Sequence, residues 1–132
     1  MNDGFGKGRV GAAIGGEPVG TGWRTFFWTA CLFNFVIGAL GMFSPEATVD
    51  ARIIGLLVLC FGIIYFLVAR DPARFGSTLW AGVVGKIGVV ALLGPSAIGP
   101  GGDPIVAAVL AGDALFAIGF LAFLLTRADV GP

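Results

Sequence analysis

The sequence predicts an all-α protein, a four-helix transmembrane bundle with both termini in the cytoplasm. The first reason is composition: 57% of the 132 residues are hydrophobic and 12% are charged, whereas soluble domains are about 45–50% apolar and about 25% charged. The second is length, because the chain contains four apolar runs close to the roughly 20 residues that a helix needs to cross a bilayer. The third is an uneven distribution of positive charge between the two sides of the predicted bundle.

The two ends of the chain are predicted to lie outside the membrane domain, which covers residues 23–127. Residues 1–22 contain eight glycines. Because glycine loses much conformational entropy on ordering, this segment is predicted to be a flexible cytoplasmic tail. It lacks the apolar core of a secretory signal. Residues 128–132 are expected to form a second, short tail.

The first span is predicted over residues 23–43 and the second over residues 51–69. Ser44 and Pro45 end the first helix, because proline cannot continue the hydrogen-bond ladder. Pro45 is also a candidate for opening the second helix, with Glu46 in its first turn. The loop between these two spans is therefore expected to be short.

The third span is predicted over residues 77–93 and the fourth over residues 105–125. An Asp-Pro pair precedes each of them, at positions 71–72 and 103–104, where aspartate caps a helix and proline fits its first turn. A Gly-Pro pair ends the third span, so residues 94–103 are predicted to be a loop without regular structure.

Positive charges predict the orientation of the bundle. Six of them fall on the N-terminal tail, the second loop and the C-terminus: Lys7, Arg9, Arg24, Arg70, Arg74 and Arg127. The opposite side holds Arg52, so the positive-inside rule places both termini in the cytoplasm. The same interface holds the predicted anchors of the bundle, which are Trp23, Trp28, Trp80, Arg70 and Arg74.

Four polar residues at bilayer depth, one from each span, are predicted to form an intramembrane polar network: Asn34, Tyr65, Lys86 and Asp113. An ammonium group at the bilayer centre costs roughly 2.5–3.5 kcal/mol on insertion scales, so Lys86 needs a partner inside the bundle. Asp113 is the acidic residue of the fourth span and the best candidate. A Lys86–Asp113 pair, or a Lys86–Asn34–Asp113 network, would fix the register of the helices.

Two other interpretations of Lys86 and Asp113 stay open. At about 1.5 Å of rise per residue, the two residues differ in depth by roughly 6–7 Å, and on antiparallel helices their Cα–Cβ bonds tilt apart. Lys86 can instead extend past Tyr65 to cytoplasmic water, with Asp113 protonated or bonded to the backbone. The third interpretation is a proton or ion relay, because intramembrane ionisable groups mark such paths. The apolar outer halves of the spans argue against a relay.

Small residues predict how the third and fourth helices pack. Lipid provides no hydrophobic drive for helix association, so close approach of small residues has to supply it. Gly82, Gly85 and Gly88 recur every three residues on the third span, and Ala108 and Gly112 form a small-xxx-small pair on the fourth. These residues predict tight packing between the two helices. The alternative is that the glycines are tolerated without a contact role.

The composition argues against several kinds of site. The chain has no histidine, which removes the usual ligand of b-type haem and the commonest transition-metal ligand. Cys31 and Cys60 form no metal-ligand motif and are interpreted as packing residues, with a disulfide between the first two helices as the alternative. No basic block supports nucleic-acid binding. No catalytic residue, metal site or cofactor is predicted, and a bound lipid or quinone stays open.

Short motifs recur in order across the four spans: Leu32-Phe33-Asn34, Phe61-Gly62-Ile63-Ile64-Tyr65, Ala69-Arg70-Asp71-Pro72, Gly85-Lys86 and Gly112-Asp113-Ala114-Leu115-Phe116. In this pattern, which covers about residues 23–125, the chain resembles small uncharacterised bacterial four-span membrane proteins that are DoxX-like in architecture. The resemblance implies a four-helix bundle in a bacterial inner membrane. Proteins of the DoxX type have been linked to quinone-coupled sulfur oxidation and to complexes with redox partners.

Three functions are weighed on these grounds. The first is a non-catalytic accessory or structural subunit that packs against a larger inner-membrane complex, with membrane lipids and other membrane-protein subunits as its partners. The second is a small transporter or a proton- or ion-conducting protein that uses Lys86 and Asp113. The third is a quinone- or lipid-binding redox accessory, in which Tyr65 and Lys86 bond a headgroup. Short loops and the lack of cofactor ligands favour the first.

Overall fold

The protein is described by a computed structural model that covers residues 19–128, so most of the predicted N-terminal tail and residues 129–132 lie outside the described residues. The elements in chain order are α2 (Thr21–Phe43), α3 (Val49–Arg70), α4 (Pro72–Phe75), η1 (Gly76–Thr78), α5 (Leu79–Ile98) and α6 (Pro104–Ala128). Four of these helices are long and apolar enough to cross a membrane. The prediction of an all-α, multi-pass four-helix fold is confirmed. The cytoplasmic placement of the termini stays a prediction.

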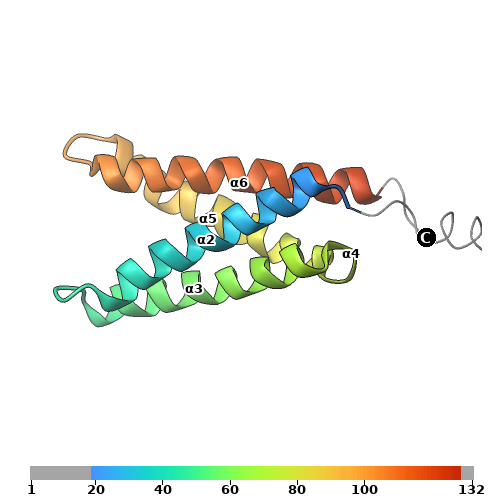
Figure 1. Ribbon diagram of the computed structural model, residues 1–132. Helices are drawn as coiled ribbons and strands as arrows, with labels where there is room; N and C mark the ends of the chain where they lie inside the picture. The colour runs from blue at the N-terminus through green and yellow to red at the C-terminus, as the bar shows by residue number, and fades with distance from the viewer. Residues whose placement is uncertain (1–18, 129–132) are drawn as a thin grey trace, which may run out of the picture.

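The four long helices form two antiparallel hairpins, α2–α3 and α5–α6, which α4 and η1 connect (Figure 1). Within each hairpin the two helices are close neighbours. The hairpins meet near α4, at the end of the bundle where α2 begins and α6 ends, which we call the terminal end (Figure 1). At the opposite end, the far end, the loops of the two hairpins lie apart (Figure 1). The hairpins therefore converge at one end of the molecule.

Glycine brings the backbones of α2 and α3 together. A Cβ atom built on Gly55 would lie 2.5 Å from the backbone nitrogen of Met42 and 2.8 Å from the carbonyl oxygen of Gly38. A Cβ atom on Gly38 would lie 2.7 Å from the backbone nitrogen of Leu59. Neither position has room for a side chain, because the neighbouring atoms belong to the backbone. Such close approach gives membrane helices their dispersion contacts, and the α2–α3 hairpin depends on it.

The start of α3 differs from the sequence prediction. Thr48 is the residue that caps this helix, because its side-chain oxygen accepts a hydrogen bond from the backbone nitrogen of Ala51 at 3.2 Å. Side-chain oxygens at this position satisfy one of the unpaired N–H groups of a helix start. The expectation that Pro45 and Glu46 open the helix is wrong, since both lie in the turn that precedes Thr48.

Arg52 ties the first turn of α3 to the end of α2. Its guanidinium group donates hydrogen bonds to the carbonyl oxygen of Met42 at 2.8 Å and to that of Ser44 at 3.0 Å. Carbonyl groups in the last turn of a helix have no partner within that helix. The guanidinium group of Arg52 therefore stabilises the turn of the α2–α3 hairpin by bonding carbonyl oxygens at the end of α2.

The end of α5 also differs from the prediction. The helix continues through Pro95 to Ile98, and the loop that follows covers residues 99–103 alone. Proline removes the hydrogen bond to the carbonyl group four residues before it, which here is that of Ala91. The hydroxyl group of Ser96 donates to a different carbonyl oxygen, that of Leu93, at 3.0 Å. The Gly-Pro pair was therefore wrongly interpreted as a helix end.

Both Asp-Pro pairs have the capping role that was predicted. The carboxylate of Asp71 accepts a hydrogen bond from the backbone nitrogen of Arg74 at 3.1 Å, at the start of α4. The carboxylate of Asp103 accepts one from the backbone nitrogen of Ile105 at 2.8 Å, at the start of α6. The first pair opens a short helix rather than the third span itself, so α5 begins only at Leu79.

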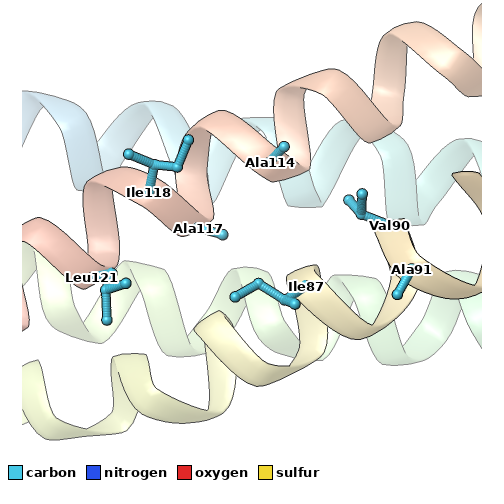
Figure 2. A pocket seen from close by; sticks show the side chains of 7 residues that line it. All are labelled: Ile87, Val90, Ala91, Ala114, Ala117, Ile118 and Leu121. Carbon is cyan, nitrogen blue, oxygen red and sulfur yellow. The ribbon is translucent and has the colours of Figure 1, made fainter.

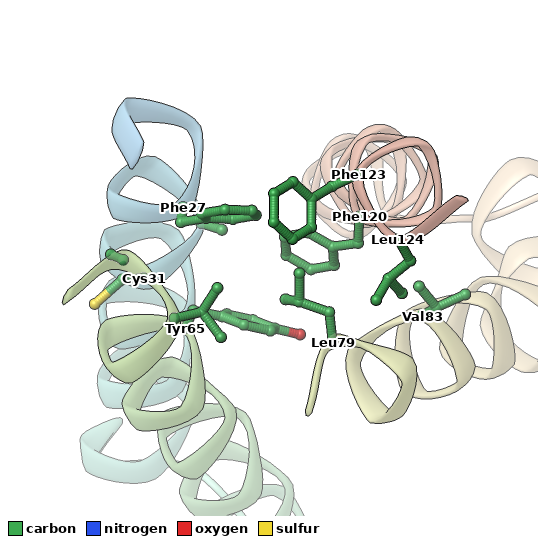
Figure 3. Close-up of a cluster of buried hydrophobic side chains, with 11 residues drawn as sticks. Phe27, Cys31, Tyr65, Leu79, Val83, Phe120, Phe123 and Leu124 are labelled. Carbon is green, nitrogen blue, oxygen red and sulfur yellow. The ribbon is translucent and has the colours of Figure 1, made fainter. Parts of the chain in front are cut away.

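Buried side chains fill the space between the two hairpins in the terminal half (Figure 3). This core cluster consists of Phe27, Ala30, Cys31, Tyr65, Val68, Ala69, Leu79, Val83, Phe120, Phe123 and Leu124. The rings of Phe27 and Phe123 meet edge to face with centroids 4.9 Å apart, and those of Tyr65 and Phe120 are tilted with centroids 4.8 Å apart. Such pairs add to the energy of apolar contact. Large side chains therefore join the two hairpins.

Trp23, one of the predicted interface anchors, also contacts the core cluster. It is half-buried and packs against the core cluster, with its ring centroid 5.2 Å from that of Phe123. The cause is the position of Trp23 in the first turn of α2, next to the end of α6. The other predicted anchors are exposed side chains: Trp28, Trp80, Arg70 and Arg74.

Candidate functional site

Three of the polar side chains that were predicted to meet at bilayer depth are bonded to one another. Nζ of Lys86 lies 2.5 Å from Oδ1 of Asp113 and donates a second hydrogen bond to Oδ1 of Asn34 at 3.0 Å. Lys86 is 6% exposed and Asn34 is 4% exposed. Hydrogen bonds between charged groups are the strong ones, and low local dielectric strengthens them further. We call Asn34, Lys86 and Asp113 the polar network.

The polar network connects all four long helices. Asn34 belongs to α2, Lys86 to α5 and Asp113 to α6. The side-chain nitrogen of Asn34 donates to the backbone carbonyl oxygen of Val58, on α3, at 3.1 Å. The amide therefore uses its oxygen for Lys86 and its nitrogen for the partner helix of its own hairpin. One connected set of bonds crosses from hairpin to hairpin.

Three aromatic rings surround the ammonium group of Lys86. Its Nζ lies 5.4 Å from the ring centroid of Phe33, and 5.5 Å from those of Tyr65 and Phe116. A cation within about 6 Å of a ring centroid is attracted to the ring face. The positive charge is therefore enclosed by two oxygen acceptors and three rings.

Tyr65 belongs to this site through its ring and not through its hydroxyl group. Its hydroxyl oxygen lies close to Gly82 on α5, at 2.8 Å from where a Cβ atom would stand. Its ring packs on Phe120, with centroids 4.8 Å apart. The space between α3 and α5, where a headgroup was considered, is occupied here by the tyrosine itself.

Phe33 and Phe116 were missed as site residues, although the spacing of Phe116 carried a signal. Phe33 adjoins Asn34 in the chain, and Phe116 follows Asp113 by three residues. Residues three apart lie on the same face of a helix. An aromatic residue at that spacing from a buried charge was therefore a candidate for its surroundings.

The structure contradicts the interpretation that Lys86 extends to water. The residue is buried and paired, and on its way to the terminal end lie Tyr65, Leu79 and Val83, all of them buried. The flexible stem of lysine covers the offset in depth that separates it from Asp113. Extension to water would leave the partly buried carboxylate of Asp113 without its cation, which is a costly arrangement.

The predicted glycine packing between α5 and α6 is wrong. Gly82 and Gly85 lie against aromatic rings of α3, and Gly112 lies against an aromatic ring of α2. Gly88 has open space where a Cβ atom would be, and Ala108 is exposed. Gly82, Gly85 and Gly112 make room for aromatic rings of the opposite hairpin. They therefore serve contacts between the hairpins and not within α5–α6.

The cysteines and the remaining hydroxyl groups form no site with the polar network. Cys31 is buried and Cys60 is exposed, and both thiols are free, which contradicts the disulfide alternative. Within residues 19–128, no three histidine, cysteine or acidic residues gather as metal ligands. Three hydroxyl groups of the spans donate to carbonyl groups of their own helices: Thr29, Ser96 and Thr126. These hydroxyls are therefore not links between the polar network and either end of the bundle.

Replacing Asn34 with leucine is expected to lower the free energy of unfolding by about 1–2 kcal/mol, because Lys86 loses one of its two oxygen acceptors. Unfolding by SDS in mixed micelles, followed by circular dichroism, measures the change. The control is the same substitution in a Lys86→Met background, where the acceptor has no ammonium group to bond. An equal loss in both backgrounds would show that Asn34 stabilises the fold without Lys86.

No family model, curated protein or solved structure matches this chain. The site is therefore interpreted from its own geometry, and the resemblance to DoxX-like proteins stays a prediction from sequence motifs. That geometry is a buried ion pair, neutral as a whole, at the contact between two helical hairpins.

Proposed function

We propose that this chain is a small non-catalytic subunit of a bacterial cytoplasmic (inner) membrane, with both termini in the cytoplasm, that packs against a larger membrane complex. The observation that carries the proposal is the polar network. Its lysine donates hydrogen bonds to both the asparagine and the aspartate, and the asparagine also bonds to α3. Buried ionic groups of this kind are best attested as devices that set register. The intramembrane charges therefore serve the fold.

The apolar outer surface supports a partner in the membrane. The two hairpins diverge toward the far end (Figure 1), and large side chains of that half are among the most exposed, such as Leu40, Leu92 and Ile98. Helices that diverge leave faces that a neighbouring membrane helix can cover by close packing. The loops at that end, residues 44–48 and 99–103, are too short to form a domain of their own.

Ion conduction and quinone binding have weaker support. A relay through Lys86 and Asp113 needs a wet route, whereas the core cluster fills the terminal half with apolar side chains. A headgroup bonded to Tyr65 needs room that Gly82 and the tyrosine ring take up. Proton flux in proteoliposomes, compared between the wild type and Lys86→Met, separates conduction from the proposed role. A wild-type flux that the substitution abolishes would contradict the proposal.

Photo-crosslinking in native membranes tests the proposed partner. A benzophenone amino acid at Leu92 is expected to join the chain to one membrane protein in fixed stoichiometry, because Leu92 lies in the diverging half and is 82% exposed. The matched control is the same amino acid at Trp80, which is exposed in the terminal half and is expected to react with lipid alone. Lipid adducts at both positions, together with a free monomer in mild detergent, would contradict an accessory role.

A further inference from the structure

An apolar groove of about 280 Å³ lies between α5 and α6 (Figure 2). Its lining consists of alanine, valine, isoleucine and leucine side chains: Ile87, Val90, Ala91, Ala114, Ala117, Ile118 and Leu121. Ile87, Val90 and Ala91 lie on α5, and the other lining residues lie on facing turns of α6 (Figure 2). No lining residue belongs to the polar network or is a buried member of the core cluster, although Leu121 packs against that cluster.

The groove has a closed floor and an open rim. Ala117 is 3% exposed, whereas Ile118 is 67% exposed and Ile87 is 52% exposed. Ile87 and Ala114 directly follow Lys86 and Asp113 in the chain. The groove therefore lies beside the ion pair, at the same depth in the bundle, and opens to the outside of the α5–α6 hairpin.

We propose that this groove binds one acyl chain of a membrane phospholipid. Its lining offers no polar side chain to a ligand, so the ligand is a hydrocarbon group. A transmembrane helix about 10–12 Å across cannot enter between two neighbouring helices whose axes lie about 8–10 Å apart. The volume is roughly twice the ~150 Å³ of an apolar cavity that holds a benzene ring, which leaves room for a segment of a flexible chain.

Charge at the terminal end places the headgroup. Arg74 and Arg127 both lie there, with their guanidinium carbons 5.1 Å and 5.5 Å from the ring centroids of Phe75 and Phe123. Ala117 precedes Arg127 by ten residues, which corresponds to about 15 Å along the helix and to half of a hydrocarbon core about 30 Å thick. An acyl chain whose phosphate lies at the level of these arginines, at the positively charged end of the bundle, therefore reaches the groove.

Retention of phospholipid after detergent washing tests this proposal. The full chain is purified in dodecyl maltoside, and the phospholipid that remains bound is counted by native mass spectrometry. Ala91→Phe fills the groove and is expected to lower the retained phospholipid about tenfold. Ala81→Phe is the matched control, because Ala81 is exposed on the same helix outside the groove, and it is expected to retain the wild-type amount.

A second variant guards against misfolding of Ala91→Phe. Ile118→Ala removes one wall of the groove at an exposed position, so the fold tolerates it, and retention is expected to fall severalfold. Equal retention by all four proteins, or none by the wild type, would overturn the proposal. So would a prenyl quinone, a second copy of the chain or another protein that is lost from Ala91→Phe in place of phospholipid. None of these outcomes depends on the partner that the proposed function requires.

Discussion

The Asp113→Ala variant is expected to lose about 3–5 kcal/mol of unfolding free energy, because it leaves the ammonium group of Lys86 buried without a counter-ion. The wild-type pair has Nζ and Oδ1 2.5 Å apart, with the side chains of Lys86 and Asp113 7% and 13% exposed. A stability of about 5–15 kcal/mol is typical of a folded domain, so this loss is a large share. SDS unfolding in mixed micelles measures it.

The double variant Lys86→Met/Asp113→Leu separates the cost of an unpaired charge from the value of the pair. Removal of both charges, with apolar side chains of similar size in their place, is expected to restore stability to the wild-type value or above it, as replacement of buried ion pairs often does. If the double variant is as unstable as Asp113→Ala, the loss comes from packing around position 113 and not from an unpaired ammonium group.

The Gly55→Ala variant is expected to destabilise the protein by about 1–3 kcal/mol, the usual cost of overpacking a close contact. The added Cβ atom would lie 2.5 Å from the backbone nitrogen of Met42 and 2.8 Å from the carbonyl carbon of Gly41. Backbone atoms cannot rotate away as a side chain does, so α2 and α3 have to separate. The same SDS titration measures the loss.

Gly88→Ala is the matched control for this substitution. A Cβ atom there meets nothing within 4 Å, and alanine is favoured over glycine in a helix by roughly 0.5–1 kcal/mol. This variant is therefore expected to equal or exceed the wild type in stability. Equal losses at the two positions would mean that glycine is needed throughout the spans, whatever its neighbours.

The spans and the ion pair were accessible from sequence because each depends on local chemistry. Apolar runs of sufficient length predict spans, and α2, α3 and α6 begin and end within three residues of the predicted limits. A lysine and an aspartate that both lie at bilayer depth are each costly alone, which predicts that they meet. The Asn34 bond to Val58 was not accessible, because it depends on which backbone carbonyl of α3 faces α2.

The pairing of the small residues could not be read from their spacing. A glycine on a helix leaves a gap, but the sequence does not say which helix fills it. Gly82 and Gly112 each belong to a series of small residues from which contacts between α5 and α6 were predicted. They instead lie against aromatic rings of α3 and α2. The backbones of α2 and α3 approach each other closely at Gly38 and Gly55, a pairing that the sequence did not predict. The helix α5 also continues through Pro95, which the Gly-Pro pair in the sequence did not predict.

A single distance tests the polar network most directly. The chain contains two lysines, Lys7 and Lys86, so solid-state NMR of the protein in lipid bilayers, with 15N-labelled lysine and 13C-labelled aspartate, resolves the ammonium group of interest. Direct dipolar coupling between Nζ of Lys86 and Cγ of Asp113 is expected, in keeping with the 2.5 Å contact to Oδ1. Coupling of Nζ to lipid phosphorus, with none to Asp113, would contradict an internal ion pair that joins the two hairpins.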